Sequence, residues 1–321
     1  MSVPVFPNTF LIGIQKAGTT TLDDWMSQHP EIYCYETLKD IHLFARFKSK
    51  EAILQRLSKE PSPYRQQPVV LQSAVNYIYY PQLMQEISNY APDAKLICII
   101  RNPVDRAISS YNYFRKMLRE TRAMREALIY NPKQTGGAFS SDNSDFTYIE
   151  HGFYGEQLEA CLQLFKREQL LILDYEDLSV NPDVLLKKLF SFLGVDNGFK
   201  PDMQAKNVTG SVKNQFVQQT VIQRKSPLRK WFVDNILDPV LPVGKRKQLK
   251  QKIFEWNTGK VRAVETAPES KEEVLSIKKQ LEPHFYADTK KLDQLLGTDY
   301  SGKWFLNKAD LSAPVQIKTQ L

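Results

Sequence analysis

The chain has few cysteines, and their placement restricts the class of protein. Its three cysteines, Cys34, Cys98 and Cys161, are odd in number and widely separated in a sequence of 321 residues. This pattern indicates neither a disulfide framework nor a metal-binding cluster, so we expect a reducing compartment. Cys98 lies inside an apolar segment and is predicted to be a core residue.

Signals for membrane insertion and secretion are also missing. Nowhere do about 18 apolar residues follow one another, so we expect no transmembrane helix. Residues 1–9 contain no basic region, no long apolar region and no cleavage signature, so they do not resemble a secretory signal. We therefore expect a soluble, cytoplasmic protein. The sequence also shows no internal repeat and no low-complexity tract.

The net charge of +7 is concentrated in one basic segment. Residues 224–260 contain ten lysines and arginines but only three acidic residues, which leaves the rest of the chain neutral overall. A basic helical segment of this kind predicts contact with one anionic partner, either an acceptor or an anionic surface, and not with nucleic acid. A solvated helical face is the alternative interpretation.

Alternation of apolar runs with amphipathic stretches predicts the fold. Strands are expected at residues 9–14, 69–71, 95–100 and 170–174, and helices at 20–29, 103–117, 155–166, 183–193 and 271–296. This order is typical of βαβ units with a central parallel sheet. We expect a P-loop-like α/β fold of three layers, with helices on both sides of the sheet and helical C-terminal additions. Residues 1–321 are predicted to form a single domain.

A candidate anion site lies between the first predicted strand and helix. Residues 13–22 read GIQKAGTTTL, so that small residues, Lys16 and three threonines occupy the turn. Backbone N–H groups at such a turn converge on an anion, and the helix dipole supports them. Lys16 adds a mobile positive charge, and the threonine hydroxyls can donate to phosphate oxygens. An ordinary strand-to-helix turn is the alternative.

This turn differs from the loop of nucleotide-hydrolysing enzymes, G-x-x-x-x-G-K-[ST]. Gly13 and Gly18 have that spacing, but Lys16 precedes the second glycine instead of following it. The strongest later strand ends in Arg101, where a magnesium-dependent enzyme would place an acidic residue. We therefore expect an anion site without a metal.

A second candidate phosphate site begins at Arg101. This residue lies at the carboxyl end of a predicted strand, where open α/β sheets bind ligands. Ser109 is two turns into the following helix and is placed to face the same pocket. A guanidinium and a hydroxyl group suit a terminal phosphate. An ordinary helix position is the alternative for Ser109.

Together the two segments resemble the sulfotransferase family that uses 3′-phosphoadenosine 5′-phosphosulfate (PAPS). The similarity covers residues 9–194 and, more weakly, 292–304, and it is nearer to bacterial homologues of the glycan (heparan-type) enzymes than to the phenol and steroid enzymes. The resemblance implies that Arg101 and Ser109 bind the 3′-phosphate, and that Lys16 also stabilises the departing phosphate. Residues implied for the 5′-phosphosulfate are Lys16, Ala17, Gly18, Thr19, Thr20 and Thr21. It further assigns Tyr154 and Lys213 to donor-binding loops.

The segment KDIHLF resembles the part of the family that carries an acidic general base. On this alignment Asp40 is the base, although the family more often has the longer glutamate. His42 is the alternative, because histidine titrates nearest to neutral pH. If the segment is extended, Asp40 and His42 face the same side. The family's Glu-Lys or Glu-Ala pair is absent at Gln72 and Ser73, and Gln72 is expected to bind the acceptor or water instead.

The predicted activity is transfer of a sulfuryl group from PAPS to a hydroxyl group, or less favourably an amine, with no metal required. The expected acceptor is a cytoplasmic small metabolite or a sugar-containing molecule. A catalytically inactive nucleotide- or membrane-binding protein that retains the fold is the alternative.

Overall fold

A parallel β-sheet lies at the centre of the protein. The computed structural model describes residues 5–35, 38–47, 49–60, 64–117, 119–135, 144–203 and 269–305. Within these ranges the sheet has five strands: β1 (Thr9–Gly13), β2 (Ile32–Cys34), β3 (Val69–Ser73), β4 (Lys95–Ile100) and β5 (Leu170–Asp174). Their order is β2-β3-β1-β4-β5, and each neighbouring pair is parallel. The strand order reverses beside the carboxyl end of β1, which is where ligands bind in open α/β sheets.

Helices cover both faces of the sheet. In the described part of the chain they are α1 (Thr19–Ser27), α2 (Leu43–Arg46), α3 (Lys50–Leu57), α4 (Pro81–Tyr90), α5 (Pro103–Lys116), α6 (Tyr154–Leu162), α7 (Asp177–Val180), α8 (Pro182–Leu193), α13 (Lys271–Leu296) and α14 (Tyr300–Trp304). Residues Glu126–Tyr130 form a π-helical turn, and short 3₁₀ turns occupy Ser144–Phe146, Glu150–Gly152 and Arg167–Gln169.

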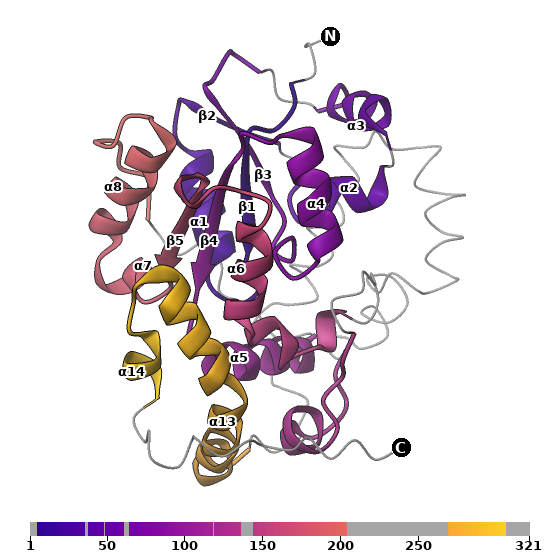
Figure 1. Cartoon of the computed structure of the whole chain (residues 1–321), viewed down its shortest axis with the longest axis vertical. Coiled ribbons are helices and arrows are strands. Elements are labelled where there is room, and N and C mark those ends of the chain that lie inside the picture. Colours follow the sequence, from indigo (N-terminus) through magenta and orange to yellow (C-terminus); the bar gives the residue numbers. More distant parts are fainter. Residues whose placement is uncertain are drawn as a thin grey trace.

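The layers are held together by buried aromatic and apolar side chains. His29, just after α1, lies 4.7 Å from the ring of Phe190 in α8 and 4.7 Å from that of Phe199, which joins these helices on one face. On the other face α6 contacts both α4 and α13. Figure 1 shows α6 in front of the sheet, α13 below it and α8 at its left. The predicted three-layer α/β arrangement with C-terminal helices is confirmed.

Local sequence explains where the chain turns from β4 into α5. Asn102 accepts hydrogen bonds at its side-chain oxygen from the backbone N–H groups of Val104 (3.0 Å) and Asp105 (3.3 Å). Pro103 occupies the first helical position, where the missing N–H group costs nothing. This cap ends the strand at Ile100 and leaves Arg101 at the carboxyl edge of the sheet.

Several predicted elements have the predicted bounds, and others were missed. β4, β5 and α13 begin and end where the sequence pattern placed them, and Cys98 is fully buried. β2 was missed because an edge strand of three residues shows no periodicity. The helix predicted at residues 155–166 ends earlier, at Leu162. Among the described residues no helix combines the length and apolarity needed to cross a bilayer.

Candidate functional site

The turn between β1 and α1 leaves the start of the helix open to an anion. Gly18, with φ of 87°, precedes α1 and supplies no capping side chain, and the first turn contains no acidic residue. The first N–H groups of a helix lack partners within the helix and carry partial positive charge. Ala17 and Thr19 are buried, Thr20 is exposed and Thr21 is half-buried. The backbone at this turn therefore suits an anion, as predicted from the sequence.

Only glycine fits at position 18. A Cβ atom there would lie 2.3 Å from Leu178 Cδ1 and 3.2 Å from the ring of Tyr175, which follows β5. The positive φ adds a second constraint, because a side chain strains this conformation. The loop of residues 13–18, which is predicted to bind phosphate and is called the phosphate loop below, is thus packed closely against residues that follow β5.

Lys16 lies in a cluster of positive charges at this turn. Its ammonium nitrogen is 4.0 Å from the centre of the Tyr113 ring in α5. Burial lowers the pKa of Lys16, and the neighbouring cations Arg101 and Lys116 lower it further. A bound anion would relieve this repulsion and favour the charged form of Lys16.

Arg101 connects the two predicted phosphate sites. Its Nη1 donates to the backbone carbonyl of Lys16 at 3.2 Å, and its guanidinium lies 4.4 Å from the centre of the Tyr175 ring. Tyr154 is buried, and its hydroxyl donates to the backbone carbonyl of Arg101 at 2.8 Å. Tyr154 therefore acts on this site by fixing Arg101.

Helix α5 is tied to the same loop. Ser110 donates from its hydroxyl to the side-chain oxygen of Gln15 at 3.1 Å. Ser109 is half-buried on this helix. It lies eight residues after Arg101, which precedes the helix, and four residues before Tyr113. The structure thus brings the loop at Lys16, the end of β4 and helix α5 to one place. Sequence reasoning missed Tyr113, although its spacing of four residues from Ser109 places both on one side of a helix.

The segment with the candidate bases is a turn and not an extended strand. Asp40 has φ of 57° and is exposed, and its N–H donates to the carbonyl of Ser73 at 2.9 Å. The expectation that Asp40 and His42 share one face of an extended segment is therefore wrong, because the left-handed residue reverses the backbone. His42 is half-buried and starts α2, with its ring 5.3 Å from that of Tyr77.

Asp40 nevertheless lies near the phosphate loop. Burial raises the pKa of Tyr113, and the carboxylates of Asp145 and Asp40 raise it further. The Tyr113 ring is also the one that lies against Lys16. Asp40 and Lys16 therefore both lie close enough to Tyr113 to interact with it.

Gln72 supports the Asp40 turn from below. Its amide nitrogen donates to the carbonyl of Ile41 at 2.9 Å and to that of Leu38 at 3.3 Å. Only 1% of Gln72 is exposed. Binding of acceptor or water by this amide nitrogen, expected from the sequence, does not match these contacts. Gln72 instead holds the backbone on which Asp40 lies.

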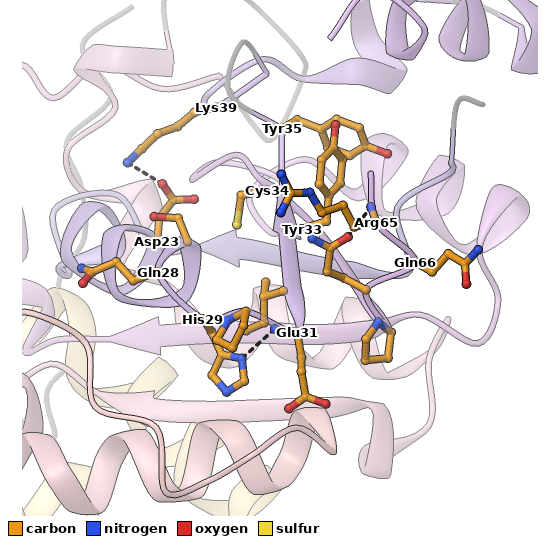
Figure 2. Close-up of a pocket in the computed structure, with 15 residues that line it drawn as sticks. Asp23, Gln28, His29, Glu31, Tyr33, Cys34, Tyr35, Lys39, Arg65 and Gln66 are labelled. Atoms are coloured by element: carbon orange, nitrogen blue, oxygen red, sulfur yellow. Dashed lines mark hydrogen bonds and ion pairs between the residues drawn. The ribbon is translucent and has the colours of Figure 1, made fainter. Parts of the chain in front are cut away.

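A cavity of about 940 Å³ lies beside the edge strand β2, and the phosphate loop does not line it. Figure 2 shows residues of α1, β2 and the segment before β3 around it. At its rim Lys39 forms an ion pair of 2.7 Å with Asp23. Of the predicted donor-binding residues that the structure describes, none lines this cavity.

Other candidate residues contribute differently. His151 is buried, and burial and Arg106 lower its pKa to about 3, so it remains neutral. In the described part of the chain, no group of three or more His, Cys, Asp or Glu side chains is arranged to hold a metal ion. Lys213 and the basic segment 224–260 lie outside the described residues.

Comparison with known proteins agrees with this geometry. Residues 6–226, more than half of the chain, match the family described as the sulfotransferase domain. The chain belongs to the sulfotransferase domain family. Its crystal-structure relatives include a sulfotransferase from Alicyclobacillus acidocaldarius, which is 28% identical with a TM-score of 0.56, over 64% of this chain and 87% of that one.

Two curated relatives act on heparan sulfate, according to their names. The bifunctional heparan sulfate N-deacetylase/N-sulfotransferase 4 of Mus musculus is 27% identical over 196 residues, which are 59% of this chain and 22% of that protein. The heparan sulfate glucosamine 3-O-sulfotransferase 3B1 of Mus musculus is 27% identical over 189 residues, 59% of this chain and 46% of that protein. The predicted resemblance to heparan-type sulfotransferases is confirmed, while the chain spans less than half the length of these two relatives.

Proposed function

We propose that this chain is an enzyme that transfers the sulfuryl group of PAPS to an acceptor hydroxyl, with an amine as the less favoured acceptor. Sulfotransferases use PAPS as their donor. The observation that carries the proposal is the hydrogen bond of 3.2 Å from Arg101 to the Lys16 carbonyl, beside an uncapped helix start. It joins two cationic segments that are 85 residues apart in the chain. Two adjacent anion sites suit a nucleotide with phosphate groups at both its 3′ and 5′ positions.

The donor would lie with its two ends on different elements. The 5′-phosphosulfate is assigned to the loop and the start of α1, contributed by Lys16, Ala17, Gly18, Thr19, Thr20 and Thr21. The 3′-phosphate is assigned to Arg101 and Ser109, with Tyr154 fixing Arg101 through its carbonyl. Lys213 is assigned to donor binding from the family resemblance.

The reaction is a displacement at sulfur. The acceptor oxygen forms a bond to sulfur while the bond from sulfur to the 5′-phosphate oxygen breaks, and a base takes the acceptor proton. Adenosine 3′,5′-bisphosphate leaves with the electrons of the broken bond. Lys16 stabilises the negative charge that develops on the departing phosphate. Fixed cations and positioning supply most of the rate acceleration in such a loose transition state.

Asp40 is the preferred base and His42 the alternative. Asp40 is exposed and its charge acts on Tyr113, whose ring contacts Lys16, so a carboxylate and the proposed donor cation both lie near this tyrosine. His42 is half-buried against Tyr77 and is oriented by that packing. A positioned carboxylate can act as general base and accept the proton of the acceptor.

The acceptor is proposed to be a cytoplasmic small metabolite or a sugar-containing molecule. One of the two relatives is named an N-sulfotransferase and the other a 3-O-sulfotransferase, so the names of proteins similar to this chain include both amine and hydroxyl acceptors. The positive charge of residues 224–260 supports an anionic acceptor or an anionic surface as partner.

Donor binding is tested by calorimetry with two nucleotides. Adenosine 3′,5′-bisphosphate should bind more tightly than AMP by roughly 1.5–3 kcal/mol, because AMP leaves Arg101 without its phosphate. Equal affinities would contradict the 3′-phosphate assignment. Turnover is then measured with ³⁵S-labelled PAPS and a panel of sugar-containing and small hydroxylated acceptors. Tight binding without turnover on any acceptor would favour an inactive nucleotide-binding protein.

The base is tested with Asp40→Asn. Asparagine tolerates the left-handed backbone at this position and removes proton acceptance, so kcat should fall by roughly 10²–10⁴ with unchanged donor affinity. Asp183→Asn is a matched control, because Asp183 lies in the first turn of α8 and pairs with Lys200 at 3.8 Å, and neither residue is among the candidate site residues. If Asp40→Asn turns over normally and His42→Asn is inactive, His42 is the base.

A further inference from the structure

Lys16 is held in an environment that opposes its charge. Burial and the cations Arg101 and Lys116 act in the same direction on its ammonium group. Without a contact that favours its charge, a lysine in this position would turn toward solvent or lose its proton. Among the contacts of the described residues, the aromatic face of Tyr113, 4.0 Å from the ammonium nitrogen, is the one that favours the charged form.

The Tyr113 ring is fixed in place by its own neighbours. Tyr113 lies on α5, the helix that is tied to the phosphate loop by the hydrogen bond from Ser110 to Gln15. Its ring packs edge to face with Phe114 at 5.2 Å and is half-buried. A ring held on a helix by such packing keeps its face in one orientation, so an ammonium group bound to that face is also oriented.

We propose that Tyr113 is a positioning residue whose ring keeps the Lys16 ammonium charged and directed to the phosphate loop before the donor binds. The proposal rests on the proposed function for the identity of the anion, but the contact between ring and ammonium does not depend on it. Arg101 is similarly placed on Tyr175, at 4.4 Å, so both cations of the site lie against tyrosine rings.

The charged groups around the pair come from every element packed against it. Arg101 at the end of β4 and Lys116 on α5 oppose the charge of Lys16. Besides burial, Asp145 and Asp40, the latter from the turn before α2, raise the pKa of the Tyr113 phenol, and Arg119 lowers it. Removal of the ring leaves the two cations in place, so the pKa of Lys16 should decrease.

The test measures the pKa of Lys16 directly in the full chain. Lysine labelled with ¹³C at the ε-carbon is titrated by NMR, and the Lys16 signal is identified from its loss in Lys16→Arg. Tyr113→Leu should lower the pKa of Lys16 by about half a pH unit, while Tyr113→Phe, which keeps the ring, should not change it. Tyr113→Gln, of similar length without a ring, repeats the test if the leucine variant does not fold.

A matched control removes a tyrosine ring that contacts a different lysine. Lys290 lies 5.5 Å from the ring of Tyr286 on α13, so Tyr286→Leu should leave the Lys16 signal unchanged. If the proposed activity is present, the alkaline limb of kcat/KM should move to lower pH by the same half unit in Tyr113→Leu and return in Tyr113→Phe.

The outcomes separate this proposal from the proposed function. An unchanged Lys16 pKa in both Tyr113→Leu and Tyr113→Gln overturns the role of the ring, whatever the enzyme activity. An equal decrease in Tyr113→Phe also overturns it, because the hydroxyl would then be responsible. Failure of the proposed function would instead appear as wild-type protein that neither binds adenosine 3′,5′-bisphosphate nor turns over PAPS.

Discussion

Replacing Gly18 by alanine tests how closely the phosphate loop is packed, with Gly297 as a matched control. Both glycines have positive φ, 87° at Gly18 and 67° at Gly297. A Cβ atom at Gly18 would lie 2.3 Å from Leu178 Cδ1 and 3.2 Å from the Tyr175 ring, whereas one at Gly297 would meet nothing within 4 Å. The two substitutions therefore share the backbone strain, and only the first adds crowding.

The expected losses of stability follow from these two contributions. A left-handed backbone costs an alanine about 1–2 kcal/mol, so Gly297→Ala should lower the free energy of unfolding by that amount. Gly18→Ala should lower it by about 1 kcal/mol more, because the Leu178 methyl group must leave its preferred rotamer and the Tyr175 ring must shift. The total expected for Gly18→Ala is about 2–3 kcal/mol.

The displacement should also reach the donor site. The Arg101 guanidinium lies 4.4 Å from the centre of the Tyr175 ring. A shift of this ring should therefore displace Arg101 and weaken binding of adenosine 3′,5′-bisphosphate by about tenfold. Gly297→Ala should bind the nucleotide like the wild type. Urea denaturation measures the stabilities and calorimetry the affinities. Equal losses of stability in the two variants, with unchanged affinity in Gly18→Ala, would refute the reasoning.

Two further substitutions test supporting contacts. Gln72→Met removes the donor to the carbonyls of Ile41 and Leu38, so the Asp40 turn should loosen and kcat should fall by about tenfold with little change in donor affinity, as steady-state kinetics would show. Asp288 accepts from the N–H groups of Gly155 (2.8 Å) and Glu156 (2.9 Å), and burial raises its pKa to about 6. Since the folded state then binds the proton more tightly than the unfolded one, the stability contributed by Asp288 is fully present below about pH 4 and is lost as the pH rises through about 6, by about 3 kcal/mol. Urea unfolding from pH 4 to 7 should show this slope in the wild type and not in Asp288→Asn; a slope that persists in the variant would assign it to another group.

Much of the fold was predictable because its strongest elements are locally encoded. β4 and α13 have the predicted bounds, since a short run of β-branched residues and a long amphipathic repeat each identify one structure. β2 and α4 escaped prediction for different reasons. β2 is a three-residue edge strand that depends on pairing with β3. α4 begins at a proline directly after a tyrosine-rich stretch, and that stretch favours strand over helix in the sequence pattern.

The arrangement of the residues proposed to bind the donor could be predicted from the sequence, and the arrangement around the proposed base less so. The positions of Lys16 and Arg101 follow from motifs at the ends of strands, whose carboxyl ends meet at one edge of a parallel sheet. The turn at Asp40 was misjudged as extended, because its left-handed φ is maintained by contacts with Ser73 and Gln72, more than 30 residues away. A local pattern contains no information on such a contact.

The sequence by itself determined the strongest strands and helices, the glycine at position 18 and the cations at Lys16 and Arg101. These features depend on periodicity, on backbone conformation and on residue type, all of which are local. Only the tertiary structure decided that Lys16 lies against Tyr113, that Tyr154 fixes Arg101 and that Gln72 supports the Asp40 turn. These contacts join distant segments, and they form only when the parallel sheet brings its strand ends together, because the orientation of each side chain is set by packing and not by its neighbours in the chain.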